Sequence, residues 1–115
     1  MEIETMRRIL AETIGWALYT DATGASWLEP PDRPEIPFSD WHPWDNWPQA
    51  GMVIEEMRAA GWRDTVNDAF YPEIKAAWYH IDHMFRFYSA TANTEPHARM
   101  LAAARALESE ANDGA

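Results

Sequence analysis

The fold is decided by residues 77–107, which read AWYHIDHMFRFYSATANTEPHARMLAAARAL. The first half of this stretch is rich in aromatic and β-branched residues, and its side chains alternate between two faces. We therefore expect a β-hairpin over 77–93 with its turn near Asp82 and His83. Residues 64–70 are expected to supply a third strand.

A helix over residues 72–90 is the alternative for part of the same stretch. Its apolar residues also follow a 3.6-residue period, at Ile74, Trp78, Ile81 and Phe85. Short apolar runs fit both patterns, so periodicity alone does not separate them. We prefer the hairpin because aromatic and β-branched residues favour strands.

The second half of the stretch predicts a helix from Thr94 to about Ala111. Thr94 is a good capping residue, Glu95 suits the positive N-terminal end, and Pro96 is tolerated in a first turn. The many alanines that follow would let this helix approach a sheet closely. Residues 112–115 are expected to fray at the end of the chain.

A first helix is predicted at the start of the chain. Apolar residues recur at three- and four-residue intervals over 2–18, and Gly15-Trp16 would end the helix. In this interpretation the glycine takes the left-handed conformation and the indole folds back onto the core. Residues 17–20 are expected to form a short extended piece, followed by turn residues at Asp21–Gly24.

A second helix is expected over residues 48–60 and would end on the pair Gly61-Trp62. Pro48 suits its first turn, and Asp45 or Asn46 can cap it. Its buried positions share a helical spacing: Ala50, Val53, Ile54, Met57 and Ala60.

These elements predict an α+β fold, with helices packed on both sides of a small antiparallel sheet in the order α-α-β-β-β-α. At 115 residues the chain is expected to form a single domain over 1–115. It has no cysteine, so disulfides and thiolate zinc sites are excluded. No apolar run approaches the roughly 18–20 residues of a membrane span. The acidic N-terminus is unlike a signal peptide, and we expect a cytoplasmic protein.

Negative charge and tryptophan are concentrated in one segment. Residues 21–56 hold eight carboxylates against one base, Arg33, and four of the chain's seven tryptophans. Six prolines fall within residues 29–48, so we expect an acidic, Pro/Trp-rich loop over 21–48 without regular structure. Loops of this length in compact domains are often functional.

The net charge is −10, from 19 acids and 9 bases. Such a chain repels phosphates and anionic lipids, so direct binding to nucleic acid or membrane is not expected. It would attract a protein with a basic surface. The alternative interpretation is that the charge only maintains solubility.

The order of elements, with Gly15-Trp16, Gly61-Trp62 and Thr94 to Leu107 at matching places, resembles the phage ABA sandwich domain family. The resemblance implies a phage or prophage origin and a layered fold of helices around a small antiparallel sheet. The acidic tryptophan-rich loop is longer than the resemblance leads us to expect. The family brings no established catalytic residues, so the resemblance assigns no site.

The sequence gives only weak evidence for a catalytic or metal-binding site. His80, Asp82 and His83 have metal-like spacing but supply at most three ligands, and we predict no metal and no cofactor. His42 could pair with Asp40 or Asp45, but no nucleophile accompanies such a pair, and we predict no catalytic residue and no enzyme.

We expect the tryptophans to divide into two groups. Trp16, Trp62 and Trp78 are expected in the core. The predicted binding site combines acids and indoles, because indoles commonly anchor binding hot spots: Asp40, Trp41, Trp44, Asp45, Trp47, Glu55 and Glu56. The alternative is that the rings near 41–47 only pin the loop onto the second helix, and a mixture of one exposed and two buried rings is a third outcome.

The expected function is a non-enzymatic phage-type interaction protein in the cytoplasm of a bacterial host. In its sharpest form it is an inhibitor of a bacterial defence system, similar to anti-CRISPR proteins, that mimics nucleic-acid charge and occludes a basic surface. Two alternatives remain open. One is a nucleotide-binding module that uses tryptophan stacking with Arg86, Arg99 or Arg105. The other is a virion structural or assembly protein.

Overall fold

The computed structural model describes residues 1–12, 15–30, 33–67, 72–83 and 85–113. The larger of its two sheets is antiparallel, in the order β4-β5-β6. The strands of this sheet are β4 (Trp62–Asn67), β5 (Ile74–His80) and β6 (Tyr88–Ala92). The predicted hairpin is therefore confirmed, and the strands β5 and β6 exclude a helix over 72–90. The predicted third strand is confirmed for residues 64–67 and begins earlier, at Trp62, while residues 68–70 lie outside the described residues.

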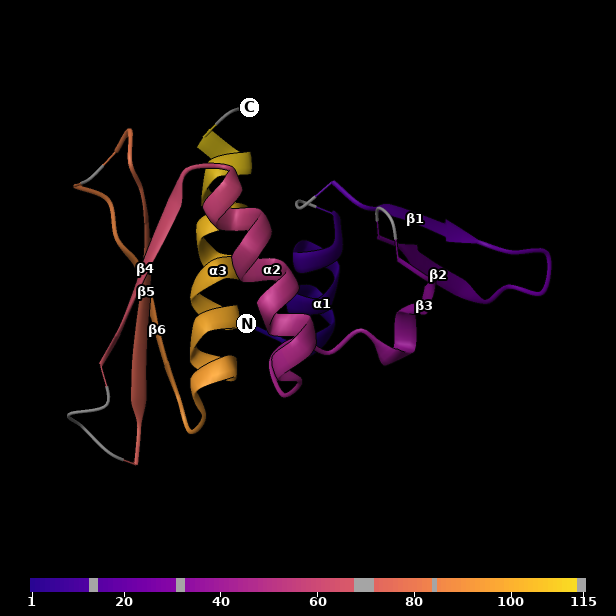
Figure 1. Ribbon diagram of the computed structural model, residues 1–115, viewed down its shortest axis with the longest axis horizontal. Helices are drawn as coiled ribbons and strands as arrows, with labels where there is room; N and C mark the ends of the chain where they lie inside the picture. Colours follow the sequence, from indigo (N-terminus) through magenta and orange to yellow (C-terminus); the bar gives the residue numbers. More distant parts are fainter. Residues whose placement is uncertain (13–14, 31–32, 68–71, 84, 114–115) are drawn as a thin grey trace.

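Helix α3 (Glu95–Asp113) lies along one face of this sheet and packs against β5 and β6 (Figure 1). The face of α3 that meets its neighbours carries fully buried alanines: Ala98, Ala102, Ala103, Ala104 and Ala106. A methyl side chain keeps the helix and the sheet close together, as the sequence predicted. Thr94 accepts the first-turn hydrogen bond from the backbone N of His97 at 3.4 Å, which confirms the cap.

The two other helices complete the helical layer. These are α1 (Ile3–Glu12) and α2 (Trp47–Ala59). Figure 1 shows α2 and α3 beside the β4-β5-β6 sheet, with α1 beyond them and a second sheet on its far side. The α+β fold in one domain is confirmed. In place of helices on both sides of one sheet, however, the helices lie between two sheets. None of the described helices is long and apolar enough to cross a membrane.

The second sheet was not predicted. Its strands β1 (Ala17–Thr20), β2 (Ser26–Glu29) and β3 (Ile36–Pro37) are antiparallel in the order β1-β2-β3. A 3-10 turn, η1 (Phe38–Asp40), follows them. The expectation of a loop over 21–48 was therefore wrong for part of its length. Proline is compatible with this sheet because Pro37 lies on an edge strand. Its missing backbone N–H therefore removes no necessary hydrogen bond between strands.

The turn that joins β1 and β2 is held by Asp21. Its Oδ1 accepts hydrogen bonds from the backbone N of Thr23 at 2.9 Å and of Ala25 at 3.1 Å. Gly24 has a φ of 87°, which side chains disfavour. The extended piece and the turn predicted at residues 17–24 are confirmed, and they prove to be half of a hairpin.

The first helix is shorter than expected. Helix α1 ends at Glu12, and Gly15, with a φ of 82°, separates it from Trp16, which is buried. The segment after Trp16 cannot remain helical because it pairs with β2. Residues 13–14 of the predicted helix lie outside the described residues.

Helix α2 begins with the predicted cap: the side chain of Asn46 accepts from the backbone N of Gln49 at 3.2 Å. Pro48 lies in the first turn. Ala60, which was predicted to be buried, follows the last helical residue and is exposed. Met52 is buried in addition to the other predicted positions.

The C-terminal helix extends further than expected. Asn112 and Asp113 belong to α3, so these two residues do not form the predicted frayed tail. Residues 114 and 115 lie outside the described residues. Trp62 and Trp78 lie in the core as predicted.

A pair of glycines tests how α2 ends. Gly61 has a φ of 98°, and a Cβ at this position would lie 2.8 Å from Nε2 of His80, whereas a Cβ at Gly51 within α2 would meet nothing within 4 Å. We expect G61A to lower the free energy of unfolding by about 1–3 kcal/mol. We expect G51A to raise it by about 0.5–1 kcal/mol, since alanine favours a helix. Urea denaturation of both variants measures this, and equal effects would contradict the assignment.

Candidate functional site

The structure separates the tryptophans of the predicted site. Trp41 is fully buried and Trp44 is 7 % exposed, so both belong to the core and neither lies at the surface as the predicted binding site requires. Trp47 is 49 % exposed. This is the mixed outcome that the sequence left open, with two rings inside and one outside.

Trp41 and Trp44 are buried because they pack against the N-terminal part of the chain. The ring of Trp41 lies 5.2 Å from that of Trp16, at an angle of 58°. The guanidinium of Arg7 in α1 lies 5.5 Å from the centre of the Trp44 ring and 5.8 Å from that of Phe38. These contacts fasten the segment between the second sheet and α2 onto the helical layer.

The same segment is held by Gln49 of α2. Its side-chain oxygen accepts from the backbone N of His42 at 2.7 Å, and its nitrogen donates to the carbonyl of Asp40 at 2.8 Å. His42 also pairs with Asp45 across a backbone turn, so the His42–Asp45 couple found by sequence exists. It serves to hold the turn.

The remaining members of the predicted site lie at the surface. Asp40, Asp45, Glu55 and Glu56 are exposed. Trp47 lies beside Arg99, whose guanidinium carbon is 5.9 Å from the ring centre. These residues stay candidates for binding, without the two indoles that were expected to accompany them.

Replacing the two kinds of tryptophan tests this division. We expect W41A to lower the free energy of unfolding by roughly 3–5 kcal/mol, because it opens a cavity in the core. W47A should cost about 1 kcal/mol or less, since half of its ring already contacts water. Chemical denaturation of both variants gives these values, and a small effect of W41A would contradict its structural role.

A second group of acidic and aromatic side chains gathers on the β1-β2-β3 sheet. The strand register places Tyr19 opposite Trp27, and Ala17 opposite Glu29. The indole N of Trp27 donates to Asp21 at 2.9 Å. We call the acidic sheet face the surface formed by Tyr19, Asp21, Trp27, Glu29 and Glu35.

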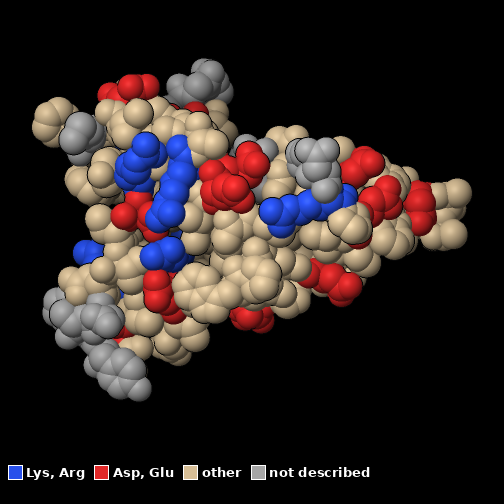
Figure 2. Space-filling model, viewed as in Figure 1, with Lys and Arg blue, Asp and Glu red and all other residues tan. Residues whose placement is uncertain are grey.

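The charges of this face lie at one end of the molecule. In the view of Figure 1, the second sheet projects away from the helical layer. Figure 2 shows carboxylates distributed along this tapering end, while most of the visible Lys and Arg side chains form a band nearer the other end. On the visible face the carboxylates are spread widely, whereas most of the positive charge lies away from the tapering end.

The carboxylates of the acidic sheet face act on Tyr19 directly. A hydrogen bond to Glu35, partial loss of water, and the negative charges of Glu35, Glu29 and Asp21 raise the pKa of Tyr19 to about 12. The pKa of Asp21 is lowered to about 2, chiefly by hydrogen bonds from the Thr23 hydroxyl and the Trp27 indole. Asp21 therefore keeps its charge over the physiological range of pH.

Sequence reasoning listed these carboxylates but did not bring them together with Tyr19 and Trp27. The signal that could have found them is local. Two short segments with strand residues, 17–20 and 26–29, flank the turn residues Asp21–Gly24, which is the pattern of a hairpin.

The pKa of Tyr19 provides a test of the acidic sheet face. Because its folded pKa lies above the ordinary value of 10, the stabilisation is complete below pH 10 and is lost as pH rises through about 12. E35Q should shift the pKa of Tyr19 downward, and E73Q should leave it unchanged. Phenolate absorbance, taken as the difference from matching Y19F variants, reports the shift, with circular dichroism to verify folding. An unshifted titration in E35Q would contradict the geometry.

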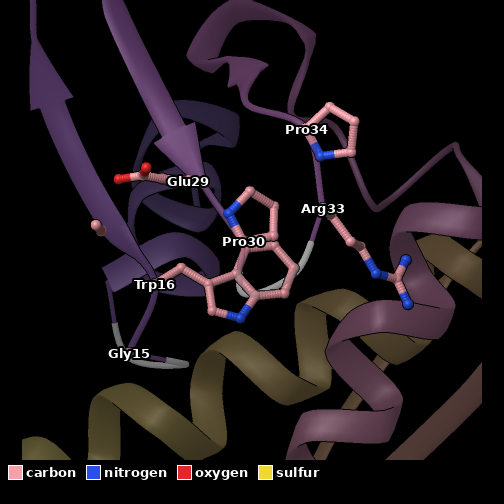
Figure 3. A pocket seen from close by; sticks show the side chains of 7 residues that line it. Gly15, Trp16, Glu29, Pro30, Arg33 and Pro34 are labelled. Carbon is pink, nitrogen blue, oxygen red and sulfur yellow. The ribbon is translucent and has the colours of Figure 1, made fainter.

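A cleft of about 630 Å³ lies between the second sheet and the helical layer (Figure 3). The indole of Trp16 and the ring of Pro30 line it, and the side chain of Arg33 extends toward the helices (Figure 3). Its volume is within the range of small-molecule sites. Arg33 and Glu29 are its charged lining residues and balance each other, so the lining favours neither sign of charge.

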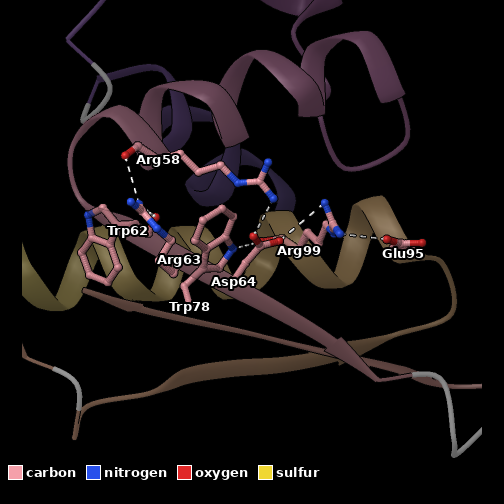
Figure 4. A network of polar contacts seen from close by, with 7 residues as sticks. All are labelled: Arg58, Trp62, Arg63, Asp64, Trp78, Glu95 and Arg99. Carbon is pink, nitrogen blue, oxygen red and sulfur yellow. Dashed lines mark hydrogen bonds and ion pairs between the residues drawn. The ribbon is translucent and has the colours of Figure 1, made fainter. Parts of the chain in front are cut away.

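Two of the arginines that were considered for nucleotide binding, Arg99 and Arg105, have partners within the chain. Arg99 pairs with Glu95 at 3.1 Å and with the buried carboxylate of Asp64 at 3.5 Å, while Arg58 binds Asp64 at 3.0 Å (Figure 4). Arg105 donates to the carbonyl of Ser89 at 2.8 Å. Asp64 and Glu95 thus offset these arginines, and the network serves to join α2, β4 and α3.

The histidines near the β5–β6 turn have structural partners. His80 is bonded to the carbonyl of Ala60 at 2.9 Å and accepts from the backbone N of Asp82 at 3.1 Å. Among the residues that the structure describes, no group of three or more His, Cys, Asp or Glu side chains could hold a metal ion.

No family model, curated protein or solved structure matches this chain. The resemblance to the phage ABA sandwich domain family therefore stays a prediction. The geometry of the acidic sheet face and of the cleft provides the basis for a function.

Proposed function

We propose that this chain is a non-enzymatic interaction protein that binds a basic surface of a partner protein through the acidic sheet face. The observation that carries the proposal is the cluster of Glu29, Glu35 and Asp21 around Tyr19 and Trp27 on a sheet that projects from the helical layer. Carboxylates supply long-range attraction, and the two rings supply contact area at small entropic cost.

The location of the face supports this role better than the site predicted from sequence. The acids at Asp40 and Asp45 flank indoles that are buried in the core. On the second sheet, by contrast, Tyr19 is exposed and Trp27 is partly exposed beside the carboxylates. A flat sheet with both kinds of side chain fits an extended or flat basic partner.

In its sharpest form the proposal is an inhibitor of a bacterial defence system that occupies a nucleic-acid-binding surface in place of phosphates. The net charge of −10 supports this form, together with the resemblance to a phage family. A second candidate function is the binding of a small molecule in the cleft beside Trp16. The cleft offers an indole and Arg33, whereas Arg99 and Arg105, which were named from the sequence, are engaged within the chain.

Charge reversal at two places tests which surface binds. We expect E29K/E35K to abolish capture of a basic partner from bacterial lysate, because it replaces attraction by repulsion. The control E73K/E108K changes the net charge equally on exposed residues outside both candidate surfaces and should retain capture. The captured protein is identified by mass spectrometry with each bait.

Two further measurements can contradict the proposal. Capture that persists when ionic strength rises from about 0.05 to about 0.5 M would exclude an electrostatic interface, because such interfaces weaken with screening. Loss of capture in D40K/D45K but not in E29K/E35K would return the site to the segment before α2.

A further inference from the structure

Strand β6 forms an open edge of the β4-β5-β6 sheet. Within the described part of the chain, the pairing found for this strand is with β5 on one side. Its five residues, Tyr88 to Ala92, include no charged residue and no proline. An edge of this kind presents free backbone groups to another strand, and proteins usually block it with charge or proline.

Two of the other edge strands, β4 and β3, contain a charged residue or a proline, whereas β1, like β6, contains neither. Strand β4 carries Arg63 and Asp64, and the two-residue strand β3 contains Pro37. Strand β1 borders the acidic sheet face, where Glu29 lies opposite Ala17. A second copy of this chain, with its own charge of −10, would meet repulsion from the carboxylates beside β1, whereas the residues of β6 itself carry no charge.

Apolar side chains beside the β6 edge are left in water. Phe85 is 100 % exposed and Phe87 is 59 % exposed, and both lie within three residues of the start of the strand. Phe87 contacts Tyr79 of β5, with ring centres 5.3 Å apart. Exposed rings next to an unblocked edge are typical of an interface.

One backbone acceptor of β6 is already used within the chain. Arg105 of α3 donates to the carbonyl of Ser89 at 2.8 Å. A carbonyl oxygen can accept a second hydrogen bond, so a strand that pairs with β6 must share this oxygen with Arg105 or displace it.

We propose that β6 pairs antiparallel with β6 of a second copy, about a two-fold axis that passes beside Ala90. In this register Ala90 faces its counterpart, and Ser89 faces Thr91 of the second copy, so small side chains meet small ones and no like charges are opposed. The two sheets become one sheet of six strands, and α3 of each copy lies on the same side of it. A two-fold arrangement closes after two copies.

The second copy is the occupant that these features favour. The sequence from Ser89 to Thr91 is nearly symmetric about Ala90, which suits pairing with itself. The acidic sheet face, at the other end of the molecule in Figure 1, stays free in both copies. The proposal therefore does not depend on the function assigned to that face.

Engineered cysteines test the register, since the natural chain has none. Opposed residues of antiparallel strands lie about 4.5–5.5 Å apart at Cα, within disulfide range, whereas diagonal neighbours lie about 7–8 Å apart. We expect S89C/T91C to form a cross-linked dimer under mild oxidation, and S89C alone to form little. T65C/N67C, exposed on the other edge strand, is the matched control and should stay monomeric.

The association itself is measured by analytical ultracentrifugation of the unmodified chain, where a dimer has twice the mass of 13.2 kDa. T91E adds a carboxylate to the β6 edge opposite Lys75, and should weaken the dimer about tenfold or more. T65E makes the same change on β4 and should leave the dimer intact. Circular dichroism verifies that both variants fold.

Several results would overturn the proposal. They are a monomer at all concentrations, open-ended polymers, a dimer that T91E leaves unchanged, or cross-linking that is as strong in T65C/N67C as in S89C/T91C. A complex that forms only with another protein's strand would also overturn it, because the occupant would then not be a second copy.

Discussion

The close approach of α3 to the main sheet is the constraint on which this fold depends. Helix α3 meets β5, β6, α1 and α2, and its buried face is built largely of alanine. Because methyl groups take little room, one helix can contact these four neighbouring elements at once. A larger side chain at Ala102 or Ala103 would separate the sheet from the helices and loosen every layer that α3 joins.

The second sheet depends on a different contact. The rings of Trp16 and Trp41 meet in the core, at the two ends of the segment that contains β1, β2 and β3. The acidic sheet face can therefore project from the helical layer while its base remains fixed. The exposed carboxylates and the buried tryptophans are thus separated in space, although they are interleaved in the sequence.

How far the sequence could predict the structure depends on whether the signal was local. Asn46 and Thr94 cap their helices within one turn, and Gly61 can adopt a positive φ without the steric cost of a side chain, so these elements were predictable. The second sheet was missed because closely spaced prolines indicate a loop, and their edge positions are visible only once the strands pair. Whether Trp41 and Trp47 are buried or exposed depends on residues distant in the sequence. Trp41 contacts Trp16 and Trp47 contacts Arg99, and no local pattern reveals these contacts.

The β1–β2 hairpin, held at its turn by Asp21 and at its base by Trp16, has a consequence for the dynamics of the domain. A projecting sheet with short strands shares fewer buried side chains with the rest of the chain than α3 does, so it can open without global unfolding. Its backbone amides should exchange with deuterium sooner than those of β5. The end of the molecule that we propose as the binding face would then also be the end that can adapt its shape.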